Sequence, residues 1–171
     1  MMHAESQWRL ATSADMPFLY DLVAAVDPRW WRCSREGLTP ARVVGVLQHL
    51  LIGAVVLDAA GHPVGAAALF DAGSVGCATL DVFALPGESN AELVRQAVPA
   101  MVEAAFAARP LRHLYHERFR RDPVLLGALE TAFRTEVVLP EFALVDGEFE
   151  DRSVSVLTAE AFDAWRSGRP T

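Results

Sequence analysis

The stretch LDVFALPGESNAELVRQAV, Leu80–Val98, leads from a strand through a short loop into a helix. A strand, a glycine-rich loop and a helix start can together hold a phosphate, because backbone N–H groups at the helix start are free to bind it. This loop has one glycine, two acidic residues and a serine. The elements on either side decide which fold the unit belongs to, and therefore what the loop does.

Three apolar runs lie before the loop, and turn signals separate them. They are Ile52–Leu57, Val64–Phe70 and Val75–Leu85, divided by DAAGHP and DAGS. Short separators of this kind between apolar runs are typical of hairpins. The sequence therefore predicts an antiparallel meander whose last strand runs into the quoted loop.

A strand and two helices are predicted before this meander. Trp8–Thr12 alternates as a strand does, and Thr12 with Asp15 forms a capping-box pattern ahead of helical apolar spacing. Thr39, followed by a proline, is the N-cap pattern of a second helix that would end near Leu51.

The second half of the chain contains both helices and strands. Pro99 lies inside a helix predicted over 90–108, so we expect a kink or short break near Val98. The segments predicted after it are a strand over 110–118, a helix over 122–133, a hairpin of strands 135–145 and 152–158, and a short helix over 159–166. Strands outnumber helices, which excludes a Rossmann sheet because there every strand alternates with a helix. The length is typical of one domain over 1–171.

Composition limits the classes of function. The 171 residues carry a net charge of −7, and all fifteen basic residues are arginines. Because lysine is absent, chemistry that needs a lysine nucleophile or Schiff base is excluded. The acidic balance argues against nucleic acid as a partner. No apolar run is long enough to cross a membrane and no secretory signal is visible, so we expect a soluble cytoplasmic protein without a membrane partner.

The C-terminal part carries the most specific pattern. It reads FRTEVVLPEFALVDGEFEDRSVSVLTAEAFDAW, residues 133–165, with an acidic turn between two strands and a short helix at the end. This tail and the element order resemble the GNAT superfamily of N-acetyltransferases, nearest to the subgroup that acetylates protein N-termini and related small amines. The resemblance implies an α/β (α+β) fold with a mixed, mainly antiparallel sheet of about seven strands and helices on both faces.

The resemblance also implies a site for acetyl-CoA. In the family this cofactor enters a V-shaped slot between the fourth and fifth strands, and its pantetheine arm pairs with the fourth strand. By position, the backbone groups of Val82, Phe83 and Ala84 would meet the pantetheine. The residues that would face the pyrophosphate are Gly87, Ser89, Asn90 and, one helical turn on, Arg95.

The loop at this site departs from the family pattern, which places glycines there. Ser89 and Glu92 form a capping-box pattern, S-x-x-E, that would occupy the free N–H groups. Glu88 and Glu92 also add negative charge where the ligand is negative. Two interpretations follow, an ordinary capped helix or an altered CoA loop that still binds.

A second departure concerns the proton donor. In the family a tyrosine after the fifth strand often protonates the departing thiolate. By the spacing between Asp122 and Phe133, Leu129 stands at that position, and leucine has no proton to donate. If acyl transfer occurs, the donor must come from elsewhere.

The densest group of candidate residues is HLYHERFRR, residues 113–121. Alternation places His113 and Tyr115 on one face and His116 on the other, so the two histidines do not share a metal and we expect no metal site. His113 or Tyr115 would act as acid or base if it faced the slot, and otherwise forms a polar rim. Related enzymes often use a carboxylate of the fourth strand as a general base, and Asp81 holds that position here; the alternative is a partly exposed strand acid.

Two further groups have open roles. In the family the loop between the first two helices covers the acceptor, so Trp30, Trp31 and Arg32 are candidate substrate-binding residues; core packing or a homodimer contact is the alternative. A positive cluster after the fifth strand would meet a phosphate or lie in solvent, and it consists of Arg118, Arg120 and Arg121.

Two functions of different class remain. The first is an acyl-CoA-dependent N-acyltransferase that moves an acetyl group to a small-molecule or peptide amine. The second is a protein of this fold that has lost acetyl-CoA transfer, and that binds a ligand or partner or catalyses a different reaction. The altered loop and Leu129 favour the second, whereas the element order favours neither.

Overall fold

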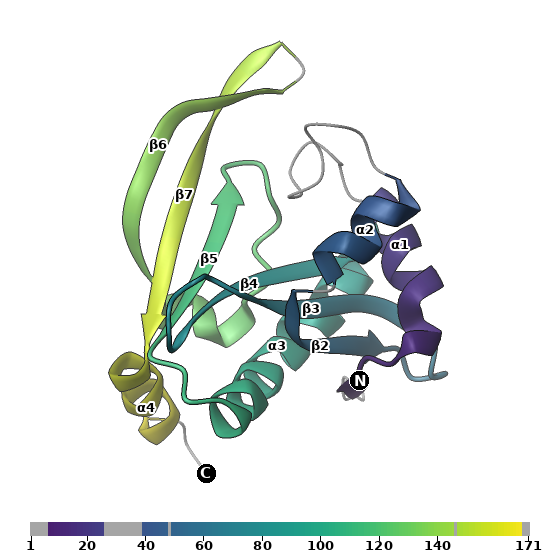
Figure 1. Ribbon diagram of the computed structural model, residues 1–171, viewed down its shortest axis with the longest axis horizontal. Coiled ribbons are helices and arrows are strands. Elements are labelled where there is room, and N and C mark those ends of the chain that lie inside the picture. Colours follow the sequence, from purple (N-terminus) through teal and green to yellow (C-terminus); the bar gives the residue numbers. More distant parts are fainter. Residues whose placement is uncertain (1–6, 26–38, 48, 146, 169–171) are drawn as a thin grey trace.

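The structure is a computed structural model that describes residues 7–25, 39–47, 49–145 and 147–168. The described strands form one mixed sheet in the order β1-β2-β3-β4-β5-β7-β6 (Figure 1). They are β1 (Gln7–Leu10), β2 (Leu50–Leu57), β3 (Pro63–Asp71), β4 (Cys77–Ala84), β5 (His113–Phe119), β6 (Arg134–Val145) and β7 (Glu148–Thr158). Neighbouring strands are antiparallel except β4 and β5, which are parallel. The expected α/β class with a mainly antiparallel seven-stranded sheet is confirmed.

Helices cover both faces of the sheet (Figure 1). They are α1 (Met16–Ala25), α2 (Pro40–Leu47), α3 (Glu88–Ala108) and α4 (Ala159–Ser167), with 3-10 segments η1 (Ser13–Asp15) and η4 (Gly127–Ala132). α3 buries Val94, Val98 and Val102 in the main core, on one side of β2–β4. On the other side, Val23 of α1 and Val43 of α2 form a second apolar cluster. No described helix is long and apolar enough to cross a membrane.

The predicted start of the first helical segment is confirmed. The backbone N–H of Thr12 donates to a carboxylate oxygen of Asp15 at 2.7 Å. Arg9 of β1 binds both carboxylate oxygens of Asp15, at 2.7 and 2.6 Å. The hydrogen bond from Arg9 is the main cause that holds the pKa of Asp15 far below its usual range.

Two of the predicted helices differ from the structure. α3 continues through Pro99 without a break, because Pro99 lies on the buried face and packing against the sheet outweighs the lost hydrogen bond. The helix expected over 122–133 is instead a turn followed by the six-residue η4. The Asp122 carboxylate accepts the backbone N–H of Phe119 at 2.6 Å and so stabilises a turn, and Gly127 has a left-handed φ of 59°.

The last hairpin is longer than predicted. β7 begins at Glu148, so most of the expected acidic turn is strand. Figure 1 shows the β6–β7 hairpin extending beyond the other strands, with β6 at the sheet edge. Apolar side chains on β6 are unusually exposed, by 45% at Val137 and 54% at Val138. Other boundaries also differ from the prediction: β1 ends at Leu10, α2 ends at Leu47, β4 begins at Cys77 and β5 begins at His113.

Candidate functional site

β4 and β5 lie side by side for only part of their length. Their parallel pairing ends where Leu80 is opposite His116. Beyond this point β4 continues to Ala84 as the partner of β3, whereas β5 continues to Phe119 as the partner of β7. The two strands therefore diverge, as Figure 1 shows. We call the interval between β4 beyond Leu80 and β5 beyond His116 the slot.

The backbone of β4 alternates between β3 and the slot. Leu85 donates its N–H to the carbonyl of Val64 on β3 at 2.8 Å. Because backbone direction repeats every two residues, Phe83 also points its N–H and C=O groups towards β3. Val82 and Ala84 then direct theirs towards the slot. Of the three residues predicted to meet a pantetheine arm, two have the required backbone direction, and Phe83 packs its ring against α1 and α2.

Helix α3 begins close to the end of β4. Its first residue is Glu88, and Gly87 is the N-cap with a φ of 123°. Ser89 therefore lies within the first turn, and the predicted Ser89–Glu92 capping box is wrong. The helix starts earlier because glycine adopts this φ without strain. Gly87 has no side chain that could cap the helix, so the N-cap position leaves the first N–H groups of α3 to an anion or to water.

The charges around this helix start are partly paired. Arg95 binds Glu92 with an Nε–Oε2 distance of 3.0 Å, and it also binds Glu88. These hydrogen bonds, with Glu92 as the larger contribution, raise the pKa of Arg95. The amide of Asn90 donates to the carbonyl of Pro86 at 3.1 Å and so braces the loop. Glu92 thus acts as an ion-pair partner, and the three charged side chains together carry a single negative charge.

The predicted acid and base residues share the sheet face towards α1 and α2. Asp81 is the first residue of β4 beyond the paired segment, and it is half-buried. Tyr115 is opposite Thr79 in the parallel pairing, so its side chain lies on the same face as Asp81. The rings of His113 and Tyr115 stack with centroids 6.2 Å apart. The structure places Asp81 at the opening of the slot and the two rings beside the paired segment.

His116 lies on the opposite face, where the slot begins. Its Nδ1 is 3.0 Å from the carbonyl oxygen of Leu80. A carbonyl can only accept, so Nδ1 carries the hydrogen and Nε2 has the lone pair in the neutral ring. Burial is the main cause that lowers the pKa of His116; the Leu80 hydrogen bond and the charges of Asp81 and Glu130 oppose this, and Arg118 adds to it. His116 is therefore a neutral imidazole at neutral pH, a role that the sequence interpretation missed.

The 3-10 segment η4 packs over this second face. Leu129 is fully buried in the main core, so the position that resembles the family tyrosine offers no proton. Phe133, just after η4, meets the ring of His116 edge-on with centroids 6.1 Å apart. The same face also carries the Arg118–Glu130 ion pair, whose Nη1–Oε1 distance is 3.2 Å.

Two arginines of the positive cluster after β5, Arg118 and Arg121, form ion pairs. Besides the Arg118 pair, Arg121 binds Glu148 and the buried Glu150. These pairs fit a structural role better than a phosphate site. The described part of the chain holds no group of three His, Cys, Asp or Glu residues that could bind a metal ion. Trp30, Trp31 and Arg32, the predicted acceptor contacts, lie outside the described residues.

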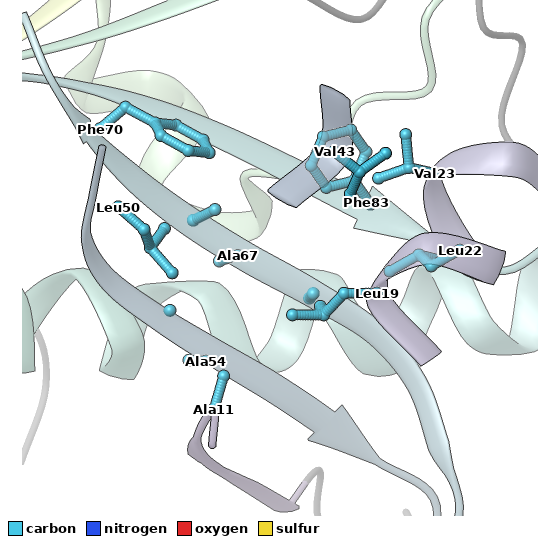
Figure 2. Close-up of a pocket in the computed structure, with 13 residues that line it drawn as sticks. Ala11, Leu19, Leu22, Val23, Val43, Leu50, Ala54, Ala67, Phe70 and Phe83 are labelled. Atoms are coloured by element: carbon cyan, nitrogen blue, oxygen red, sulfur yellow. The ribbon is translucent and has the colours of Figure 1, made fainter. Parts of the chain in front are cut away.

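An apolar pocket lies beneath α1 and α2. Figure 2 shows Leu22, Val23 and Val43 around it, with Phe83 at the end nearest β4. Its lining consists of aliphatic and aromatic side chains and one glycine. Because no polar side chain of a described residue lines it, the described part of this pocket offers packing and no group that could transfer a proton.

Solved structures of similar shape define the class of fold. A complex of spermidine N-acetyltransferase from Vibrio cholerae with CoA and spermine has a TM-score of 0.72 and 15% identity, covering 92% of this chain and 98% of that one. A protein named as a phosphinothricin N-acetyltransferase has a TM-score of 0.63 and 16% identity, covering 90% and 98%. No protein-family model and no curated protein matches the sequence. The chain therefore has the fold of the GNAT N-acetyltransferases.

Proposed function

We propose that this chain is an acyl-CoA-dependent N-acyltransferase that moves an acetyl group to an amine of a small molecule or peptide. The observation that carries the proposal is the divergence of β4 from β5 beside the uncapped start of α3. Diverging strands leave backbone groups for an extended ligand arm, and a helix start offers N–H groups to phosphate.

Acetyl-CoA suits both parts of this arrangement. The backbone groups of Val82 and Ala84 would bind the amides of the pantetheine arm. The N–H groups of the first turn of α3, from Gly87 to Asn90, would bind the pyrophosphate. Arg95, held by Glu88 and Glu92, offsets part of their charge and so limits the repulsion of the ligand.

The proposed chemistry is direct attack of the amine on the thioester carbonyl carbon. An amine reaches the site mostly protonated, so a base must first remove one proton. Asp81 is the proposed base, acting directly or through one water, because it lies at the opening of the slot. Backbone N–H groups of β4 that face the slot would stabilise the oxyanion. His113, on the same face, would receive the proton next, and the hydroxyl of Tyr115 would relay it only by giving up its own proton as it takes one.

The acceptor class is proposed from a structural neighbour. A structural neighbour was solved with spermine, so a polyamine is the first small amine to test. Trp30, Trp31 and Arg32 are the proposed contacts of the acceptor, since they lie in the segment that joins α1 to α2.

A second function has its own support. Glu88 and Glu92 place acids beside the helix start, and the buried Leu129 provides no proton donor. These residues fit a protein of this fold that has lost acetyl transfer and binds another ligand or a partner.

Calorimetric titration with CoA and with acetyl-CoA separates the two functions. The transferase should bind both, and ligand at about 100 times its dissociation constant should stabilise the fold by about 2.7 kcal/mol. Adenosine 3′,5′-bisphosphate is the matched control, because it lacks the pyrophosphate and the pantetheine arm. No heat and no thermal shift at millimolar CoA would overturn the proposal.

A further inference from the structure

We infer that His116 is the proton-transfer group of the slot, taking a proton from the attacking nitrogen and passing it to the departing thiolate through Nε2. This inference rests on the proposed function. When the N–C bond forms, the nitrogen still carries one proton too many, even after Asp81 has removed the first. That proton moves to Nε2 as the C–S bond breaks, and then to the sulfur. The products are an amide and a thiol, and no further reactant is needed.

His116 lies where the pairing of β5 with β4 ends. It occupies the last position of β5 that pairs with β4, opposite Leu80, where the two strands separate. A ligand arm that runs along β4 in the slot would end near this point. The imidazole therefore lies where the reacting end of such an arm would come to rest.

Two contacts fix the orientation of the His116 ring. The Nδ1–H is used by the carbonyl of Leu80, at 3.0 Å, and Phe133 meets the ring edge-on. These contacts leave Nε2 as the basic nitrogen, and no described residue hydrogen-bonds it. A basic nitrogen on a half-buried ring that is held by two contacts suits a transient proton.

Three charged side chains act on the His116 ring, those of Arg118, Glu130 and Asp81. Arg118 and Glu130 face the ring from β5 and η4, and they form an ion pair with each other at 3.2 Å. Asp81 approaches from β4 but has its side chain on the other face of the sheet. Burial outweighs these charges and keeps the ring neutral, which is the form that accepts a proton. The imidazolium that results is a readier acid than an ordinary histidine, so it gives its proton up to the thiolate.

The experiment is an NMR pH titration of protein labelled at the histidine ring nitrogens. The protein is saturated with CoA or with desulfo-CoA, which differs by the thiol sulfur alone. We expect the titration midpoint of His116 to differ between the two complexes by about 0.5–1 pH unit, because imidazole and thiol share a proton. His62, exposed in the β2–β3 turn, is the internal control and should titrate identically.

The variant His116→Gln assigns the signal and supplies a second readout. Thiolate absorbance reports the pKa of the thiol of bound CoA, which should be lower in the wild-type protein than in His116→Gln or in free CoA. Identical His116 titrations in the two complexes would overturn the inference and leave the proposed function standing. Failure of the wild-type protein to bind CoA would overturn both.

Discussion

A Cβ atom at Gly127 would lie 2.1 Å from the carbonyl oxygen of Arg95. The backbone at the start of η4 is thus pressed against the backbone of α3, within the helical turn that bears the Arg95 side chain. The segment after Gly127 carries Leu129 into the core and leads to Phe133 beside His116. This close approach therefore connects α3, at the proposed phosphate site, to the face of the slot on which His116 lies.

Replacing Gly127 should destabilise the fold more than its φ alone requires. Gly127→Ala combines a left-handed φ with a backbone collision, and we expect a loss of about 2–4 kcal/mol in the free energy of unfolding. Gly61→Ala is the matched control, because Gly61 has a φ of 83° and nothing within 4 Å of its Cβ position; it should lose about 1 kcal/mol. If urea denaturation shows equal losses of unfolding free energy in Gly127→Ala and Gly61→Ala, the contact with α3 does not contribute to the cost.

Stability should depend on the Arg9–Asp15 pair in acid. The pKa of Asp15 in the fold lies below the value of about 3.9 in an unfolded chain, so this carboxylate stabilises the fold above that pH. The contribution is lost as the pH falls from about 4 through the folded pKa. Asp15→Asn should cost about 1–3 kcal/mol at pH 7 and flatten the acid slope, measured by denaturation between pH 2 and 7. Asp21→Asn, an exposed change on α1, should keep the wild-type slope.

Removing acid from the start of α3 should strengthen CoA binding. Glu88→Gln removes one negative charge near the proposed pyrophosphate and releases Arg95 from one of its partners. We expect the affinity to rise about 3- to 10-fold by calorimetry at low salt, with a smaller gain at high salt. Asp163→Asn makes the same charge change on α4 and should leave affinity unaltered. An equal gain in both variants would mean that net charge, and not the site, is responsible.

Asp81 should affect turnover more than cofactor binding. Asp81→Asn keeps the shape of the side chain but removes its basicity, so kcat should fall by about 10²- to 10³-fold with CoA affinity unchanged. Thiol release from acetyl-CoA with spermidine as the acceptor measures the change. Asp71→Asn, at the end of β3, is the matched control and should keep wild-type turnover. A variant of Asp81 with normal kcat would exclude it as the base.

The sequence predicted the sheet well where local signals were sufficient. The runs that became β2, β3 and β4 alternate with short turns, and each turn fixes an antiparallel neighbour. It failed at the helix expected over 122–133, because a periodic apolar pattern cannot reveal that Gly127 touches the backbone of α3. The S-x-x-E pattern at Ser89 failed for a simpler reason, since Gly87 started the helix earlier.

The site was predicted in part. Asp81, His113 and Tyr115 do share a face, which follows from two-residue alternation. Alternation also placed His116 on the other face, but it could not show that β4 and β5 separate at that residue. The end of a strand pairing depends on which partners each strand finds elsewhere in the sheet, and no local signal contains that information.

The short pairing of β4 with β5 also affects the order in which the strands pair during folding. Four residue pairs join two antiparallel half-sheets, β1–β4 on one side and β5–β7–β6 on the other, and among the described strands they are the only link. β2–β3–β4 and β6–β7 consist of hairpins that close locally, whereas this link joins segments about 36 residues apart. We expect the β4–β5 pairing to form late and to open first, so the amide hydrogen of Tyr115, which alternation directs towards β4, should exchange sooner than those within β3. The proposed reacting centre would then be the least protected part of the described sheet.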